Sequence, residues 1–190
     1  MSADFAAARL NMVESQVRPS DVTDLALTDA FRGVARESLL PADKAFAAYA
    51  DAEVEYAPGR WLLRPRDVAK LLQALQPRGG ESALAIAAPY AAAILEALGV
   101  TVTRLDGDDL TPPTGSTYDI VLSEGAVCAV PGSWKEALAK GGRLGVIERD
   151  GPAGKAFVYV RADDGVAGRA TFDSAPPYLA GFQPVHGFAF

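Results

Sequence analysis

The sequence predicts an α/β fold with a doubly wound, mostly parallel sheet, helices before the sheet and an antiparallel hairpin after it. Three observations support this prediction. Residues 82 to 106 follow the pattern strand, turn, helix, strand, which is typical of the opening unit of such a sheet. Two more strand patterns, at 118 to 122 and 143 to 148, are separated by a short helical segment. Residues 156 to 172 alternate on both sides of a turn, which indicates a hairpin.

The first strand-to-helix turn of the predicted sheet has an unusual composition. An apolar strand over 83 to 87 leads to Pro89, which suits a first helical position because no N–H is needed there, and Gly99 ends the helix. The next strand, Val100 to Leu105, stops at Asp106. Ligands of such units bind at the first turn, where glycines allow close approach, and at the acid that ends the second strand. Here the acid is present, but alanine and proline replace the glycines.

The N-terminal region predicts three helices and one long connection. Residues 5 to 17 favour a helix that stops before Arg18 and Pro19, because proline restricts the residue that precedes it. Asp24 can cap a second helix, and residues 42 to 65 predict an irregular connection long enough to be functional. The apolar stripes of the second and third helices are Leu27, Ala30, Phe31 and Val34, then Val68, Leu71, Leu72 and Leu75.

The segment after Asp106 is too short for the usual connection between parallel strands. The eleven residues 107 to 117 include two prolines, whereas a helical crossover takes about a dozen residues or more, so we expect an extended crossing. A short helix is predicted to open near Pro131 and to end before Gly141. The tail, 187 to 190, is aromatic enough to pack against the fold.

Composition limits the class of protein. With 190 residues, of which 49% are hydrophobic and 22% charged, the chain fits one domain over 1–190, with helices and the long loop in 1–80 and the core sheet in 81–190. The net charge is −6 and no basic stripe occurs, so neither nucleic acid nor a membrane surface is expected as a partner. No basic signal region or bilayer-length apolar segment is present, so we expect a cytoplasmic protein.

Short motifs along nearly the whole chain resemble, in the same order, those of the protein-L-isoaspartate O-methyltransferases. Each motif is weak alone, but the ordered set is specific. The motifs are Met12 to Arg18, Val34 to Pro41, Tyr49 to Asp51, Gly59 with Pro65, Tyr118 to Ile120, and Gly141 to Leu144. The resemblance implies a class I, Rossmann-like methyltransferase fold. It also implies an S-adenosylmethionine (SAM)-dependent activity that methylates the carboxylate of isoaspartyl residues in damaged proteins.

The chain departs from this family at the cofactor positions. The family's first cofactor motif contains an acid and alternating glycines, where this chain has Ala85, Ala87 and Pro89. Asp106 alone matches a cofactor residue of the family, as the acid that binds ribose hydroxyls. The resemblance therefore implies cofactor-binding positions that are vestigial in this chain.

The departures extend to the substrate segment and to the crossover. Where the family has two hydroxyl side chains over the active site, this chain has the apolar segment Trp61, Leu62 and Leu63, which we expect to pack into the space of a ligand. The family also places a helix and a further outer strand in the interval 107 to 117, and the end of that strand forms one wall of the adenine pocket. Both are expected to be absent here.

Other reactive groups have ordinary explanations. Asp106, Asp108 and Asp109 lack the glutamate that would complete a calcium loop, so we interpret them as a solvated turn and expect no metal site. Cys128 follows a predicted buried strand, and His186 is the only histidine, so Cys128 is expected to be a small buried residue with no nucleophilic role.

Two functional hypotheses remain. The first is a pseudoenzyme that has lost SAM binding and catalysis and acts as a binding or interaction module, with no cofactor. The alternative is a divergent, active SAM-dependent protein-L-isoaspartate O-methyltransferase with a rearranged site. Without the outer strand, Val100 to Leu105 becomes a sheet edge, so we expect a homodimer through this edge or the crossover 111 to 116 folded against it. Proline at Thr101 or Thr103, whichever points its N–H outward, would test the pairing.

Overall fold

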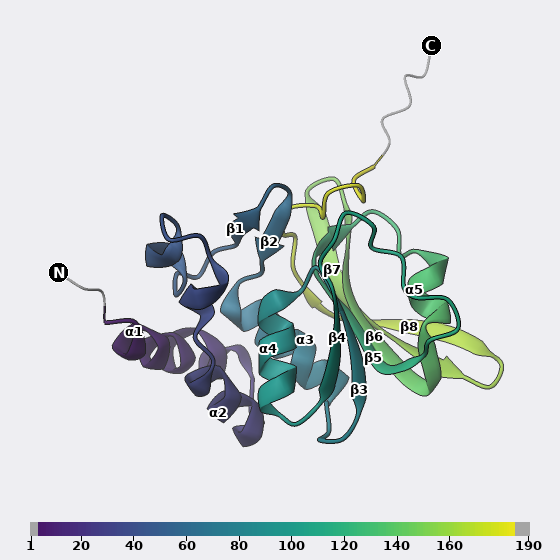
Figure 1. The fold of residues 1–190 in the computed structure, drawn as a ribbon, viewed down its shortest axis with the longest axis horizontal. Coiled ribbons are helices and arrows are strands. Elements are labelled where there is room, and N and C mark those ends of the chain that lie inside the picture. The colour runs from purple at the N-terminus through teal and green to yellow at the C-terminus, as the bar shows by residue number, and fades with distance from the viewer. Residues whose placement is uncertain (1–3, 185–190) are drawn as a thin grey trace, which may run out of the picture.

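The central sheet has six strands in the order β4-β3-β5-β6-β7-β8 in the computed structural model, which describes residues 4–184 (Figure 1). The strands are β3 Ser82–Ile86, β4 Thr101–Leu105, β5 Tyr118–Val127, β6 Leu138–Asp150, β7 Ala153–Ala162 and β8 Gly165–Asp173. β4, β3, β5 and β6 are parallel neighbours, and β7 and β8 add an antiparallel hairpin. The predicted fold class is confirmed, with β4 at the edge where the missing outer strand would lie.

Helices cover the two faces of this sheet unequally. The helices are α1 Phe5–Met12, α2 Leu25–Gly33, α3 Pro65–Leu75, α4 Pro89–Ala97 and α5 Gly132–Glu136. Shorter helical turns are η1 Val13–Val17, η2 Arg18–Ser20, η3 Arg36–Leu39 and η4 Ala45–Ala47. α3 and α4 lie against one face, with α1 and α2 outside them, whereas α5 lies on the other face (Figure 1). The stripe predicted for the third helix, Val68, Leu71, Leu72 and Leu75, is buried against the sheet.

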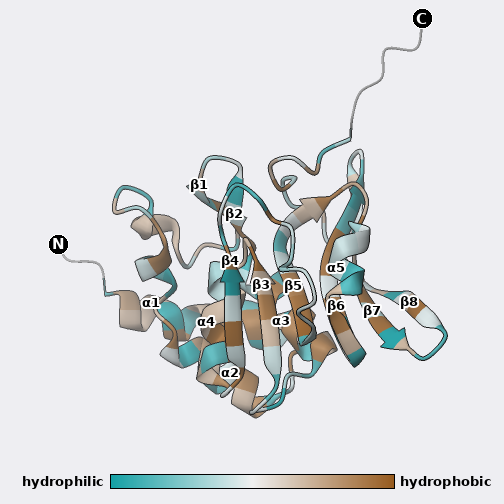
Figure 2. Cartoon of the chain, turned by 45° about the vertical axis from the view of Figure 1, so that its right-hand side comes forward, coloured by the Kyte–Doolittle hydropathy of each residue, from teal (hydrophilic) through white to brown (hydrophobic). Residues whose placement is uncertain are grey.

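The apolar core is divided by the sheet into two clusters, because successive side chains of a strand point to opposite faces. In β3, Ala83 and Ala85 belong to the cluster beneath α3 and α4, whereas Leu84 and Ile86 belong to the cluster that contains Trp134 of α5. Figure 2 shows apolar colour along β3, β5 and β6, as expected for strands buried on both faces.

The crossover from β4 to β5 is extended, as its length predicted. Residues 107 to 117 contain no regular helix or strand. Leu110 is buried in the cluster of Trp134, and its carbonyl accepts a hydrogen bond from the indole Nε1 at 3.1 Å. Among residues 4–184, no backbone hydrogen bond joins this crossover to β4. The crossover therefore covers the α5 face of the sheet, and β4 has no strand partner on its outer side within 4–184.

The strands β5 and β6 are longer than the sequence predicted. The ladder between them is irregular around Gly125, whose φ of +119° favours glycine, and pairing resumes at Ala126. β6 begins at Leu138, before the predicted start at 143, and α5 ends at Glu136. Periodicity alone does not reveal such extensions, because a bulge interrupts the alternation of apolar residues.

The connection 42 to 65 was predicted to be irregular, and this prediction is wrong in part. It contains η4 and the antiparallel hairpin of β1, Val54–Ala57, and β2, Arg60–Leu62. Gly59 in the turn has a φ of +66°, and its N–H donates to Glu55 Oε1 at 3.0 Å. The strands are only four and three residues long, which leaves too little alternation to be recognised.

Three smaller predictions have different outcomes. The first helical segment changes from α1 to η1 at Val13 and continues past residue 17 as η2, because Pro19 is tolerated in the first turn of η2, where an N–H partner is not required. Cys128 is exposed, so the prediction of a small buried residue is wrong: it follows the end of β5 and lies beyond the apolar core. The tail 187 to 190 lies outside the described residues.

No helix within 4–184 is long and apolar enough to cross a bilayer.

Candidate functional site

The carboxyl end of β3 leads into α4 through a backbone conformation that favours glycine. Ala87 has a φ of +45°, and its N–H donates to Leu105 O at 2.9 Å, which ties the turn to the end of β4. Such a left-handed conformation costs about 1–2 kcal/mol for a residue with a Cβ. Pro89 then occupies the first turn of α4, as predicted. The turn therefore keeps a glycine-like backbone although its residues carry Cβ atoms.

A buried carboxylate fills the N-terminus of α4. Glu124, in β5, is fully buried, and its Oε1 accepts hydrogen bonds from the N–H groups of Tyr90 at 2.9 Å and Ala91 at 2.8 Å. Its Oε2 accepts from the Leu63 N–H at 3.0 Å. The free N–H groups and the dipole of a helix N-terminus form an anion site, and here the anion comes from the chain itself.

Arg36 is a fully buried cation on the helical side of this site. Its Nε donates to Ala48 O at 2.7 Å and its Nη2 to Leu63 O at 2.8 Å, and its guanidinium lies 4.6 Å from the centroid of the Tyr90 ring. Burial raises the pKa of Glu124, whereas its N–H donors and the Arg36 charge act in the opposite direction. Every recorded partner of the carboxylate is a donor, which suits the ionised form.

The hairpin β1–β2 covers the carboxyl end of the sheet (Figure 1). Arg60 Nη2 donates to Gly107 O at 3.0 Å, which joins the hairpin to the loop after β4. Burial raises the pKa of Tyr56, and the negative charges of Glu124 and Asp106 add to this shift. The hairpin is therefore held over the carboxyl ends of β3 and β4, where the sequence pattern indicated a ligand site.

The structure brings some of the predicted site residues together and separates others. Leu62 and Leu63 are fully buried in the cluster beneath α3 and α4, and the backbone of Leu63 contacts Glu124. Trp61 is half-buried in the hairpin, Ala85 is buried in β3, and Asp106 is exposed directly after β4. Thus only the turn before α4 and the segment after β2 meet at the buried carboxylate.

Sequence reasoning missed Glu124 and the role of Arg36. A glutamate inside the apolar run 120 to 127 was the available signal, because a charge is rarely fully buried without a partner. Arg36 occurred only as part of a family motif, with no charge partner that could be identified nearby in the sequence.

Apolar side chains close the other side of this region. Ala87, Leu110, Val127 and Leu179 belong to one buried cluster. The segment after β8 lies along the end of β5: Leu179 N–H donates to Ala126 O at 2.8 Å, and Ala126 N–H donates to Pro177 O at 3.0 Å. Apolar packing therefore replaces a polar lining beside the turn.

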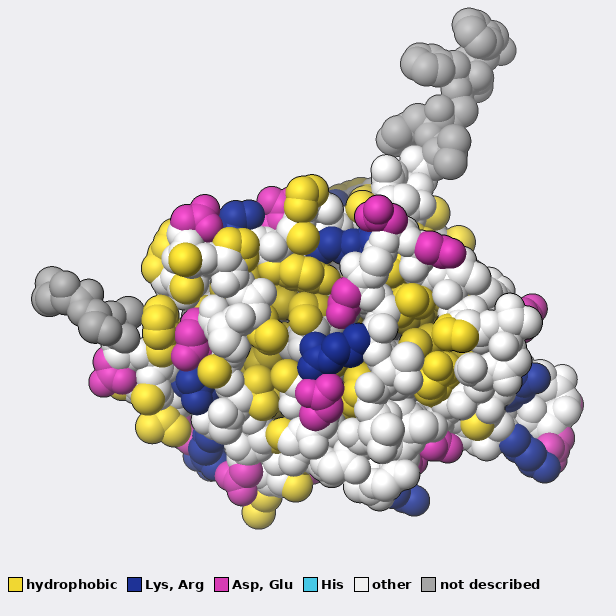
Figure 3. Space-filling view, viewed as in Figure 1, with side chains coloured by type: hydrophobic (Ala, Val, Ile, Leu, Met, Phe, Trp, Pro, Cys, Tyr) yellow, Lys and Arg dark blue, Asp and Glu magenta, His cyan; other side chains and the backbone are white. Residues whose placement is uncertain are grey.

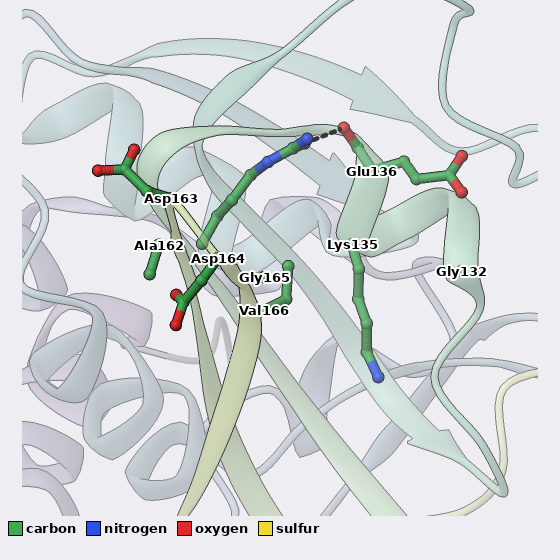
Figure 4. Close-up of a pocket in the computed structure, with 9 residues that line it drawn as sticks. Gly132, Lys135, Glu136, Ala162, Asp163, Asp164, Gly165 and Val166 are labelled. Carbon is green, nitrogen blue, oxygen red and sulfur yellow. Dashed lines mark hydrogen bonds between the residues drawn. The ribbon is translucent and has the colours of Figure 1, made fainter.

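Pockets elsewhere on the surface are less suited to a ligand of this fold. One, of about 500 Å³, lies between α5 and the β7–β8 turn and is lined by Lys135, Arg161, Asp163 and Asp164 (Figure 4). Arg161 Nη1 donates to Glu136 O at 2.9 Å. This pocket is at the amino end of β6, whereas ligands of open α/β sheets bind at the carboxyl ends of strands. On the face in Figure 3, acidic and basic side chains are interspersed.

The residues described contain no group of three or more His, Cys, Asp or Glu side chains that could hold a metal ion. Asp109 Oδ1 instead accepts from the Thr111 N–H at 2.9 Å, a local turn contact.

Known proteins similar to this chain share one description. A protein-L-isoaspartate O-methyltransferase of Methylorubrum populi is 33% identical over 80% of this chain and 84% of its own length. The relative in Methylorubrum extorquens is 31% identical over 96% of this chain and 90% of its own length. A comparison with models of protein families gave no match.

Solved structures agree on the fold. One protein-L-isoaspartate O-methyltransferase matches with a TM-score of 0.71 and 19% identity, over 91% of this chain but 66% of its own. Another, from Plasmodium falciparum and in complex with S-adenosyl-L-homocysteine, has a TM-score of 0.71 and 13% identity, over 94% of this chain and 99% of its own. The sequence relatives, together with the Rossmann-like sheet, show that this chain belongs to the protein-L-isoaspartate O-methyltransferase family.

Proposed function

We propose that this member of the family is a pseudoenzyme, which neither binds SAM nor transfers a methyl group and which acts as a binding or interaction module. The observation that carries the proposal is the position of Glu124 on the N–H groups of Tyr90 and Ala91. A cofactor that bound the N–H groups of this helix N-terminus would have to displace the buried Glu124 carboxylate, which already accepts from three N–H donors.

The residues of the turn also do not fit SAM. Ala85 offers no carboxylate to a cofactor, and it is buried among apolar side chains. Ala87 carries a Cβ at a φ of +45°, where a glycine would let the cofactor approach the backbone. Asp106 is exposed and is the one polar group at a matching position. The turn of this chain therefore lacks the contacts that a SAM-dependent methyl transfer would need.

The size of the deficit can be estimated. An intact site with micromolar affinity supplies about 8 kcal/mol. Loss of a charged hydrogen-bond partner at Ala85 removes about 1.5–3 kcal/mol. The Cβ at Ala87 and the missing adenine wall bring the total to about 4–6 kcal/mol, or three to four decades in affinity. Asp106 alone does not offset a loss of this size.

Calorimetric titration of the full chain with SAM and with S-adenosyl-L-homocysteine tests the proposal. A catalytically active relative of the family, titrated under the same conditions, is the positive control. We expect no saturable heat for this chain up to about 1 mM ligand, and no methyl transfer to an isoaspartyl peptide. A micromolar Kd, or transfer to the peptide, would overturn the pseudoenzyme proposal.

The alternative of a divergent, active methyltransferase predicts a different pattern. It requires saturable SAM binding that weakens in Asp106→Asn, because Asp106 keeps its exposed place after β4. Binding that is insensitive to this substitution would place the ligand elsewhere on the chain.

A further inference from the structure

Two residues of the edge strand β4 have outward backbone groups without a backbone partner among the residues that the structure describes. Thr101 N–H donates inward to Glu81 O at 2.9 Å, and Leu105 O accepts from Ala87 N–H at 2.9 Å. Residues of an edge strand alternate between bonding inward and pointing outward, so the N–H and C=O groups of Val102 and Arg104 point away from the sheet. A proline at Thr101 or Thr103 therefore does not test the pairing, because the N–H groups of both residues point toward β3.

The side chains of β4 separate onto two different surfaces. Val102 packs against the cluster beneath α4, and Arg104 Nη2 lies 2.8 Å from Glu96 Oε2 of that helix. Thr101 and Thr103 are exposed on the opposite face. The edge has one cation, which already has an anionic neighbour on α4, and no proline.

We propose that β4 is a self-pairing edge, which binds β4 of a second copy of this chain in antiparallel orientation about a two-fold axis at Thr103. The outward groups define this register. When Val102 of each copy lies opposite Arg104 of the other, both residues exchange their N–H···O bonds. The two Val102–Arg104 pairs related by the two-fold axis use every outward N–H and C=O group of these residues in both strands.

The side chains are compatible with this register. Thr103 faces Thr103 of the second copy, Thr101 faces Leu105, and Val102 faces Arg104, so no like charges lie directly opposite each other. The two Arg104 side chains share one surface with the two Glu96 carboxylates, which balances the charge there. This self-complementarity favours a second copy over a strand from an unrelated protein.

Disulfide cross-linking tests the register. In a Cys128→Ser background, which removes the exposed native thiol, Thr103→Cys places two thiols opposite each other in a non-hydrogen-bonded pair, with Cα atoms about 4.5 Å apart. The matched control Thr101→Cys faces Leu105, so its two thiols are about 13 Å apart. We expect a disulfide-linked dimer for Thr103→Cys only. Equal cross-linking of both variants, or none in Thr103→Cys, would refute the register.

Analytical ultracentrifugation tests the pairing itself. We expect a concentration-dependent dimer of the full chain, with a dimer Kd at least tenfold higher in Arg104→Pro, because proline removes one outward N–H from each copy. Arg104→Ala keeps the N–H and should change the dimer Kd less than Arg104→Pro does. Circular dichroism and thermal melting check that both variants fold. Monomer alone at about 200 μM, or an unchanged dimer in a folded Arg104→Pro variant, would overturn the proposal.

Discussion

Replacing Glu124 by glutamine perturbs the buried anion without changing its shape. The carboxylate accepts three hydrogen bonds, two at Oε1 from Tyr90 and Ala91 and one at Oε2 from Leu63. An amide has one acceptor oxygen and one NH₂ group. In either orientation of the glutamine side chain, at least one backbone N–H therefore faces another donor.

The expected cost follows from these contacts. A hydrogen bond to a charged group contributes about 1.5–3 kcal/mol and a neutral one about 0.5–1.5 kcal/mol, so neutralisation weakens the two bonds that the amide oxygen can keep by about 2–3 kcal/mol in total. A buried donor without a partner adds about 1–3 kcal/mol. These two losses sum to about 3–6 kcal/mol, and neutralisation recovers part of the desolvation cost that raises the pKa of Glu124. We therefore expect Glu124→Gln to lower the free energy of unfolding by about 3–5 kcal/mol, a large part of the 5–15 kcal/mol typical of a domain.

Urea denaturation followed by tryptophan fluorescence measures this change, since Trp134 is buried in the folded chain. Glu136→Gln is the matched control, because Glu136 is exposed and should change the free energy of unfolding by less than about 0.5 kcal/mol. Adding Arg36→Met completes a double-mutant cycle. If the two buried charges interact, the double variant loses less stability than the sum of the single variants.

A loss below about 1 kcal/mol in Glu124→Gln, equal to that of Glu136→Gln, would refute the reasoning. It would mean that Glu124 does not hold the N-terminus of α4 in solution. The argument that this carboxylate competes with a cofactor would then fail as well.

Two further substitutions test the strained turn and a second buried carboxylate. Ala87→Gly relieves the strain of a residue with a φ of +45°, whereas Ala85→Gly removes an equally buried methyl group from a regular strand. Urea denaturation should therefore show Ala87→Gly to be more stable than Ala85→Gly by about 1–2 kcal/mol. Equal stabilities of the two variants would argue against strain at Ala87. Burial raises the pKa of Asp67, while the hydrogen bond from Ser174 opposes the shift. A raised carboxyl pKa means that the folded state binds the proton more tightly, so the wild-type chain should lose stability relative to Asp67→Asn as the pH rises from 4 towards 7; a relative gain would contradict the direction of the shift.

Local sequence was sufficient for the unit from β3 to β4 and for the deleted strand. Pro89 and Gly99 define α4 through their own backbone preferences, which need no distant partner. The extended crossover follows from the length of 107 to 117 alone, because a chain that short has no room for a helix. The family resemblance was likewise carried by short motifs in a fixed order.

Tertiary structure decided the chemistry of the candidate site. Glu124 meets α4 only because β5 pairs with β3 in the register Ile86 to Ser123, which places the next residue of β5 at the start of the helix. Which N–H groups of β4 point outward depends on the bond between Thr101 and Glu81. The position of Glu124 and the direction of the β4 N–H groups both depend on contacts between segments that are distant in the sequence. The pattern of a strand specifies which side chains share a face, but it does not specify which N–H groups pair with the neighbouring strand or which residue lies at the end of the strand.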